Sequence, residues 1–196
     1  MHRFFDILFS LLGLIILTPF LCIISLLIVA SSKGGVFYLQ TRVGQHHKDF
    51  TLYKFRTMTP NADKKGLLTV GERDERITKA GYFLRKYKWD ELPQLWNVLK
   101  GDMSLVGPRP EVRKYVEMYN NEQKRVLEVR PGITDYASIE FVNENQILSQ
   151  SGDYEKKYME EIMPQKLRLN LKYIENRSLK EYFMILFLTA KSIVIR

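Results

Sequence analysis

The sequence contains a single cysteine, Cys22, and this scarcity excludes a fold that depends on disulfide bonds within the chain. A chain of 196 residues that uses no disulfides suits a reducing compartment, and its length suggests one domain with an additional segment. The three histidines, His2, His46 and His47, do not have the spacing of metal ligands. The glycine-rich Walker and dinucleotide-binding motifs are also missing, so the common nucleotide-binding loops are not expected.

Charge is almost absent from the first 30 residues, which contain only Arg3 and Asp6. The rest of the chain is basic, and the net charge of the whole is +8. A basic body attracts anionic partners, among them nucleic acid, anionic lipid headgroups and phosphorylated substrates. The charge alone does not choose between these partner classes.

The apolar run from Ile7 to Ala30 has 24 residues without a charge. A straight helix of this length would reach roughly 36 Å, which is enough for a bilayer core of about 30 Å. One interpretation is therefore a straight transmembrane anchor. A cleaved signal peptide fits less well, because the run is long for such a segment.

A proline at the middle of the run favours a different membrane arrangement. Pro19 has no N–H to donate to the carbonyl of Ile15, and the hydroxyl of Thr18 can bond a nearby backbone carbonyl instead. Each half of the run would measure roughly 18 Å and could not cross alone. Because Arg3 and Lys33 flank the run and positive charge prefers the cytoplasmic side, we expect a re-entrant helix, broken at Thr18 and Pro19, with both ends in the cytoplasm.

Short strand and helix signals follow residue 32. Residues 36–40 and 50–58 alternate with the period of strands and predict a β-hairpin, while 77–87 has helical spacing. Residues 130–134 read as a turn. A capping box of Ser178 and Glu181 predicts a last, largely apolar helix. The predicted fold class is therefore α+β, mostly helical with a small β-hairpin, with a re-entrant membrane helix at 1–32, amphipathic interfacial helices, and a cytosolic domain at 33–196.

Asp90 and Glu91 are the first candidates for chemistry. Adjacent helical residues do not face each other, so this pair does not flank one bond as acid and base. The simplest interpretation is a helix start, with Asp90 as the cap and the acids favoured by the helix dipole. The alternative is a nucleophilic carboxylate, which can attack phosphorus only if cations offset the repulsion between two anions.

Three basic residues could supply those cations. Arg109 lies between two prolines in "GPRP", which limits the backbone on either side of a guanidinium suited to bind phosphate. Arg85 lies five residues before Asp90, and Lys54 belongs to the second strand of the hairpin. Each has an ordinary structural interpretation as well. Two carboxylates among cations also suit Mg²⁺, which takes one or two carboxylates together with substrate phosphate oxygens.

Four segments give a more specific indication. "FYLQTRVG", "YKFRTM", "FLRKYKWDELPQLWNVLKGDMSLVGPRP" and "VRPGIT" resemble the bacterial sugar transferase family, the monotopic polyprenyl-phosphate phosphoglycosyl transferases. The resemblance covers about residues 1–135 and fits the minimal, single-domain type. After "PGIT" the chain departs from the family, because it reads "DYASIEFVNEN" where many members have a glycine, an aromatic residue and "AQVNGR".

The resemblance implies a reaction and a place in the cell. Asp90 would attack the β-phosphate of a UDP-sugar, release UMP and form a phosphosugar-aspartate, with Glu91 assisting. Polyprenyl (undecaprenyl) phosphate would then accept the phosphosugar and initiate a surface glycan or glycoconjugate. Arg109, Arg85 and Lys54 would bind phosphate, and Mg²⁺ would be required, with Asp90 as its protein ligand. The enzyme would lie on the cytoplasmic leaflet of the bacterial inner membrane and would not bind nucleic acid.

Alternatives stay open at this point. A non-catalytic basic adaptor, anchored in the membrane and binding anionic lipid or nucleic acid, would share the apolar run and the net charge. A straight spanning helix would change the topology without changing the chemistry. The sequence does not identify the sugar, the pathway or the oligomeric state, and it leaves a homodimer open.

Overall fold

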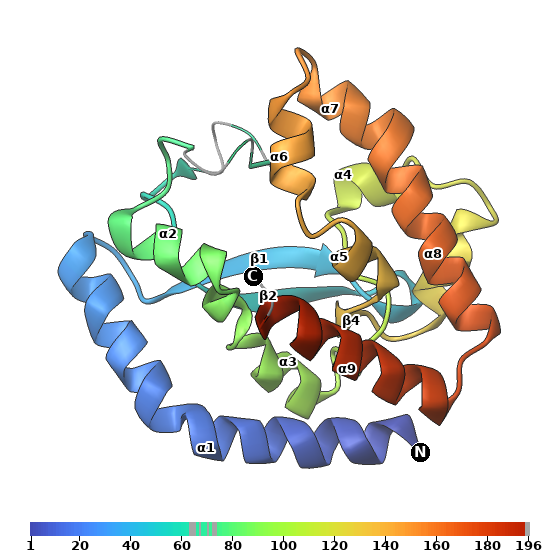
Figure 1. Cartoon of the computed structure of the whole chain (residues 1–196), viewed down its shortest axis with the longest axis horizontal. Coiled ribbons are helices and arrows are strands. Elements are labelled where there is room, and N and C mark those ends of the chain that lie inside the picture. The colour runs from blue at the N-terminus through green and yellow to red at the C-terminus, as the bar shows by residue number, and fades with distance from the viewer. Residues whose placement is uncertain (63–65, 67, 70, 72–73, 195–196) are drawn as a thin grey trace.

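The computed structural model describes residues 1–62, 66, 68, 69, 71 and 74–194, and helices form most of it (Figure 1). The helices are α1 His2–Ser31, α2 Lys79–Lys86, α3 Gln94–Lys100, α4 Arg113–Val116, α5 Tyr136–Glu140, α6 Glu144–Ser149, α7 Tyr154–Lys157, α8 Met163–Glu175 and α9 Leu179–Val194. The strands are β1 Phe37–Val43, β2 Asp49–Phe55, β3 Ser104–Val106 and β4 Gly132–Thr134. The predicted class, α+β and mostly helical, is confirmed.

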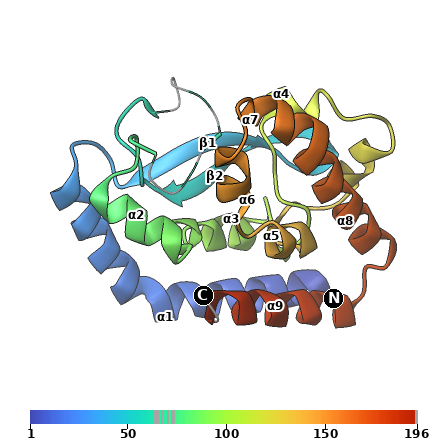
Figure 2. The same ribbon diagram turned by 45° about the horizontal axis from the view of Figure 1, so that its top comes forward.

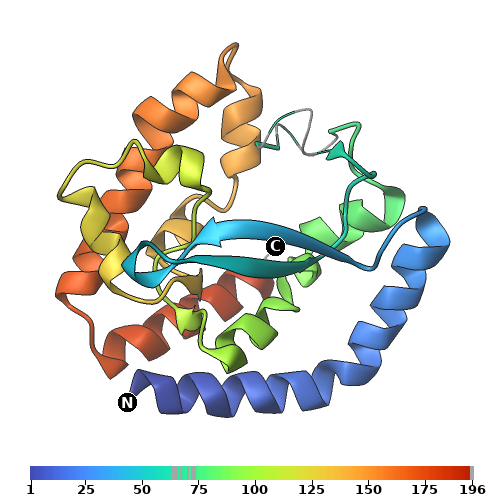
Figure 3. The same cartoon turned by 180° about the vertical axis from the view of Figure 1, so that it is seen from behind.

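Two small sheets join the helices. β1 and β2 form the predicted antiparallel hairpin, with Phe37 opposite Phe55, and Figure 3 shows it extended across one face of the molecule. β3 and β4 pair in parallel. The predicted turn at 130–134 was therefore wrong in part, because Gly132–Thr134 is a strand. Three residues are too few to show the periodicity of a strand. Gly132 allows the two strands to approach closely, because a β-carbon there would stand 2.1 Å from the backbone nitrogen of Gly107.

The helix predicted to begin at Asp90 begins later. Asp90 lies in the 3₁₀ turn Trp89–Glu91, and α3 starts at Gln94 after Pro93, without a side-chain cap. The buried face of α3 consists of Gln94, Asn97 and Val98. Lys88 has a φ of 58°, so the chain turns sharply between α2 and the acids. The interpretation of Asp90 as a helix cap is therefore wrong.

The last two helices follow the prediction more closely. The backbone N–H of Glu181 donates to Ser178 Oγ at 3.2 Å at the start of α9, as the capping box requires. Before α8 the chain makes a π-helical turn, Tyr158–Ile162, and Pro164 occupies the first turn of α8. The irregular turn accommodates a proline that could not continue the preceding hydrogen-bond ladder.

α1 is a continuous helix, and it bends in its middle (Figure 1). The hydroxyl of Thr18 donates to the carbonyl oxygen of Leu14 at 2.6 Å, as expected beside Pro19. The bend and this hydrogen bond agree with the predicted disturbance at Thr18 and Pro19, although the chain does not leave the helix there. α1 is long and apolar enough to cross a membrane, and only 11% of its most apolar 18-residue window is buried.

Polar side chains tie the first end of α1 to the rest of the protein. The guanidinium of Arg3 donates to backbone carbonyls at the end of α3, at 2.9 Å in the case of Leu99. The carboxylate of Asp6 is buried, and its Oδ1 accepts from Ser104 Oγ at 3.0 Å, from Leu105 N at 2.9 Å and from the Tyr182 hydroxyl at 2.8 Å. A buried carboxylate with three donors fixes this end of α1 against β3 and α9.

The second end of α1 contacts the same body. The guanidinium of Arg56, at the end of β2, donates to the carbonyl oxygen and the hydroxyl of Ser32, each at 3.0 Å. Ile24 and Ile28 of α1 pack with Phe55 in a small buried cluster. Both ends of α1 are therefore held by one folded unit, and the helix wraps around its base (Figure 1).

α9 lies alongside the first half of α1 (Figure 2). The ring of Phe183 on α9 contacts those of Phe5 and Phe9, with centroids 5.1 and 6.3 Å apart. Phe187 on α9 is 66% exposed, and much of the neighbouring α1 surface is also exposed and apolar. The two helices thus present a shared apolar surface on one side of the molecule.

Candidate active site

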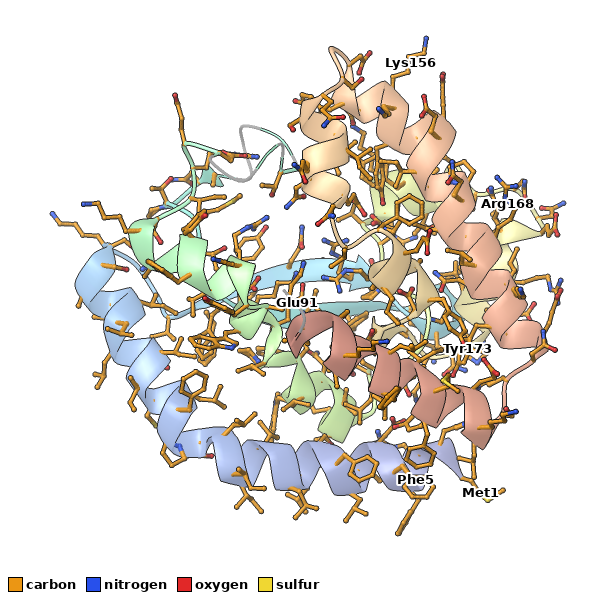
Figure 4. All side chains as sticks on the ribbon, in the orientation of Figure 1. Met1, Phe5, Glu91, Lys156, Arg168 and Tyr173 are labelled. Carbon is orange, nitrogen blue, oxygen red and sulfur yellow. The ribbon has the colours of Figure 1, made fainter. Side chains whose placement is uncertain are left out.

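The two acids of the site lie on a turn and point into different environments. The left-handed residue Lys88 directs the chain into the 3₁₀ turn that carries Asp90 and Glu91. Asp90 is 6% exposed, and its Oδ1 has no hydrogen-bond partner among the described residues. Glu91, which Figure 4 labels near the centre of the molecule, faces two cations. The turn therefore separates the roles of the two neighbouring carboxylates.

Glu91 joins two elements that are distant in sequence. Its Oε1 accepts from Lys54 Nζ of β2 at 3.2 Å and also from the guanidinium of Arg109. Its Oε2 accepts from Arg109 Nη1, again at 3.2 Å. This bidentate contact fixes the plane of the guanidinium. Two of the predicted phosphate-binding residues are thus brought together by one of the predicted catalytic acids.

The charges of this triad influence one another. Burial alone would raise the pKa of Glu91, but Arg109 and Lys54 together hold that pKa well below its ordinary value. Glu91 in turn raises the pKa of Arg109. Burial lowers the pKa of Lys54, although the Glu91 charge opposes the change. Glu91 is therefore ionised and engaged, which suits positioning rather than proton transfer.

Asp90 has the opposite electrostatic character. Burial raises its pKa, and the neighbouring Glu91 charge adds to the effect. Lys54, Arg85 and Lys88 oppose the shift. A buried carboxylate with a raised pKa and an unpartnered oxygen is a costly arrangement, and such groups gather at functional sites.

Arg109 is also held through its backbone. Its N–H donates to Asp135 Oδ2 at 3.1 Å, and Asp135 Oδ1 accepts from Ser138 N at 2.6 Å, which caps α5. Asp135 is 0% exposed. The sequence did not indicate this role for Asp135. The segment that begins at Asp135 differs from the family pattern, and nothing in it shows which backbone group the carboxylate would bind.

All five predicted site residues line one cavity of about 460 Å³. Asp90, Glu91, Arg109, Arg85 and Lys54 are among its walls. The side chain of Arg85 makes no hydrogen bond or ion pair with the described residues, although its charge acts on Asp90. Thr18 and Pro19, the predicted helix break, are not among the lining residues and lie in α1.

The cavity has further polar walls that the sequence did not indicate. Arg42 donates to Pro110 O at 3.1 Å and pairs with Glu111 at 3.5 Å. The Tyr158 hydroxyl donates to Glu111 Oε1 at 2.7 Å. Lys166 Nζ on α8 donates to Glu144 Oε2 on α6 at 2.7 Å. Arg42 lies in "FYLQTRVG" and Glu111 directly follows "GPRP", but neither was singled out as a site residue. The acids and lysines of 144–166 belong to no recognised motif and resemble ordinary surface residues of helices.

The carboxylates of the site differ in whether they could bind a divalent cation. Asp90 offers a buried carboxylate oxygen without a partner, whereas both oxygens of Glu91 are engaged by Lys54 and Arg109. Among the described residues, no group of three or more His, Cys, Asp or Glu side chains could hold a metal ion. The site thus fits an ion that takes one protein ligand and completes its shell with substrate oxygens and water, as Mg²⁺ does.

The chain is similar in sequence to proteins of known family. The sequence matches a family model described as "Bacterial sugar transferase" over residues 1–196. It is 41% identical over its whole length to the "Uncharacterized sugar transferase EpsL" of Bacillus subtilis, of which it covers 88%. It is 36% identical, over 94% of its length, to the "UDP-glucose:undecaprenyl-phosphate glucose-1-phosphate transferase" of Escherichia coli and covers 38% of that protein.

A third relative differs in its sugar. The "UDP-N-acetylgalactosamine-undecaprenyl-phosphate N-acetylgalactosaminephosphotransferase" of Aeromonas hydrophila is 41% identical over 70% of the chain, which covers 33% of that protein. The Escherichia coli and Aeromonas hydrophila relatives therefore share undecaprenyl phosphate in their names and differ in the sugar.

Proposed function

Because this chain belongs to the bacterial sugar transferase family, we propose that it transfers a sugar 1-phosphate from a UDP-sugar to polyprenyl phosphate and releases UMP. The observation that carries the proposal is the buried Asp90 carboxylate, which has an oxygen that no described residue hydrogen bonds, in a cavity lined by Lys54, Arg85 and Arg109. This arrangement suits attack on a phosphorus atom that bears negative charge. The reaction would initiate a surface glycan or glycoconjugate.

The proposed chemistry takes two displacements. An Asp90 oxygen attacks the β-phosphorus of the donor, the bond to the bridging oxygen breaks, and UMP leaves with the electron pair. A phosphate oxygen of the lipid then attacks the same phosphorus and displaces the Asp90 carboxylate, which gives polyprenyl-diphosphate sugar. Glu91 keeps Arg109 and Lys54 in place. The N–H groups of these two cations that do not hydrogen bond Glu91 donate to substrate phosphates.

The electrostatic arrangement suits both displacements. Burial raises the pKa of Asp90 and so disfavours its ionised form before substrate arrives, and the charges of Lys54, Arg85 and Lys88 oppose this effect. We propose that Mg²⁺, held by Asp90 and by substrate oxygens, neutralises phosphate charge when it is bound. The protein supplies the orientation, because Arg109 is fixed both at its guanidinium and at its backbone.

The attachment of α1 supports a re-entrant topology. A straight spanning helix would place its ends on opposite sides of the bilayer, roughly 40 Å apart. In this protein Arg3 and Asp6 at one end, and Ser32 at the other, contact the same folded unit. We infer that both ends lie on the cytoplasmic face of the inner membrane and that the bent helix dips into one leaflet, where it holds the cavity next to the lipid phosphate.

The test is UMP release by purified protein with Mg²⁺, polyprenyl phosphate and a panel of UDP-sugars. We expect release with at least one sugar, and a loss of about a thousandfold or more in Asp90→Asn, because the nucleophile is removed. Without acceptor, a labelled sugar phosphate should be trapped on Asp90. The matched control is Asp49→Asn, which removes a carboxylate from the exposed pair with Arg113 and should remain active.

A non-catalytic adaptor predicts a different result. Such a protein would bind anionic lipid or nucleic acid in a salt-dependent way, and Asp90→Asn would not change the binding. Absence of UMP release across the panel, together with binding that survives the substitution, would contradict the proposed enzyme.

A further inference from the structure

The residues that line the cavity include two chemically different groups, which we name the polar wall and the apolar wall. The polar wall is formed by Arg42, Glu111, Glu144, Tyr158 and Lys166, which hydrogen bond or pair with one another. The apolar wall is formed by Leu92, Leu95, Ile139, Leu186 and Ile193. The proposed reaction also has two chemically different substrates, a nucleotide sugar and a lipid. Since the two walls belong to one cavity that also contains Asp90 and Glu91, each wall can serve one substrate.

The apolar wall begins at the reacting carboxylates. Leu92 follows Glu91 directly in the chain, and Ile139 belongs to α5, whose cap Asp135 also binds the backbone of Arg109. Figure 4 places Glu91 beside the C-terminal end of α9, and Leu186 and Ile193 of α9 line the same cavity. A molecule lying on this wall would have one end next to the catalytic acids.

The other end of the wall meets the membrane helix. A β-carbon at Gly13 of α1 would stand 3.2 Å from Leu95 Cδ1, so the two segments are in close contact. α9 packs against the first half of α1 through Phe183 and Phe5 (Figure 2). Two of the three helices that contribute to the wall, α3 and α9, therefore rest on α1, the element proposed to enter the bilayer.

We propose that the apolar wall of α3, α5 and α9 binds the first isoprene units of the acceptor lipid and guides its phosphate to Asp90. The proposal rests on the proposed function. An isoprenoid chain is apolar and remains in the bilayer, so it requires an apolar path that joins the membrane helix to the reacting acids. The nucleotide sugar, which has many hydrogen-bonding groups, suits the polar wall.

The test separates lipid contact in the cavity from contact with the membrane. Ile193 is 45% exposed, so Ile193→Gln should fold normally, and Ile193→Leu keeps the apolar surface. With a short, water-soluble isoprenoid phosphate as acceptor, Ile193→Gln should raise the KM for the acceptor by about three- to tenfold, because apolar contact area is lost. The KM for the UDP-sugar should not change, and Ile193→Leu should restore the acceptor KM.

The matched control is Phe187→Gln on the same helix. Phe187 is 66% exposed and is not among the residues that line the cavity. This variant should leave the KM for the short acceptor unchanged. An unchanged acceptor KM in Ile193→Gln, or an equal rise in Phe187→Gln, would overturn the proposal while UMP release by the wild type still supported the proposed function.

A second measurement does not depend on turnover. A short isoprenoid phosphate that carries a photoreactive diazirine should label peptides containing residues 186–193 or 92–95. Excess unmodified isoprenoid phosphate should compete the label away. Labelling confined to other segments would contradict the apolar wall even if the enzyme were inactive in the assay.

Discussion

Single residues in this site have opposite electrostatic duties although they are adjacent in sequence. Asp90 is buried with a free oxygen, and Glu91 is buried with both oxygens engaged. The pKa of Asp90 is raised by burial, while the pKa of Glu91 is lowered by Arg109 and Lys54 against the effect of burial. Among the described residues, one acid is thus left with an unpartnered oxygen and the other pairs with cations.

This difference predicts opposite pH dependences of stability. Because the folded pKa of Asp90 is raised, its contribution to stability is complete below its unfolded pKa and is lost as the pH rises through the folded pKa. Asp90→Asn should therefore have a higher Tm than the wild type at pH 8 in EDTA, and the difference should shrink toward pH 5. Thermal unfolding followed by circular dichroism measures it.

Glu91→Gln is the control with the opposite sign. The lowered pKa of Glu91 gives stability above its unfolded pKa that is lost only at lower pH. Glu91→Gln should therefore be less stable than the wild type at pH 8. If both variants changed Tm in the same direction at pH 8, the assigned duties of the two acids would be wrong.

A second prediction at this scale concerns Asp135, which binds Arg109 N and Ser138 N with separate oxygens. Asp135→Ala should lose the cap of α5, at a cost of about 1 kcal/mol, together with the support of Arg109. Asp135→Ser can still cap α5 but cannot serve both donors. We expect Asp135→Ser to recover most of the stability while kcat stays about tenfold or more below that of the wild type, because Arg109 is displaced. Near-normal kcat in Asp135→Ser would show that capping alone matters.

At the scale of elements, α1 is the segment whose structure says most about function. A hydroxyl beside Pro19 satisfies a carbonyl in the middle of the helix, and both ends are attached to the same body. The hydrogen bonds of Arg3 and Asp6 join the N-terminal end of α1 to α3 and β3. The hydrophobic pattern of α3 and β3 does not indicate that they contact α1.

The topology predicts where the first residues lie. In a Cys22→Ser background, His2→Cys in intact cells should react with a membrane-impermeant maleimide only after the inner membrane is made permeable. The reason is that the proposed topology puts both ends of α1 on the cytoplasmic side. Lys33→Cys provides the matched position at the other end and should behave in the same way. Reaction of His2→Cys in cells whose inner membrane is intact would show a spanning helix.

At the scale of the whole molecule, apolar and charged surfaces are separated. α1 and α9, which lie side by side (Figure 2), share an exposed apolar surface, while Lys156 and Arg168 lie on the helices at the other side of the molecule (Figure 4). The net charge of +8 adds attraction to an anionic leaflet. This arrangement suits a protein that lies on a membrane surface with its cavity next to the lipid headgroups.

The separation of apolar and charged surfaces predicts which residues contact lipid and which contact water. In a Cys22→Ser background, an environment-sensitive dye on Phe187→Cys should show blue-shifted emission in anionic vesicles and resist an aqueous quencher, because we infer that the exposed apolar face of α9 contacts lipid. The same dye on Lys156→Cys should report water. Equal quenching at the two positions would mean that α9 does not face the membrane.

Much of this protein was predictable from its sequence alone. The hairpin, the apolar first helix with its disturbed middle and the capped last helix follow from local periodicity, a proline and a capping box, because each signal acts within a few residues. The family resemblance was carried by the continuous block around Asp90 and was confirmed by the match over residues 1–196.

Only the tertiary structure decided how the site works. It moved Asp90 from a helix cap to a buried turn, brought Glu91 to Lys54 and Arg109, and joined Asp135 to the backbone of Arg109. These contacts link residues that lie up to 37 positions apart, and no local pattern encodes which distant group a buried charge will meet. Burial and long-range pairing, which set the charge and position of each group, arise only when the chain has folded.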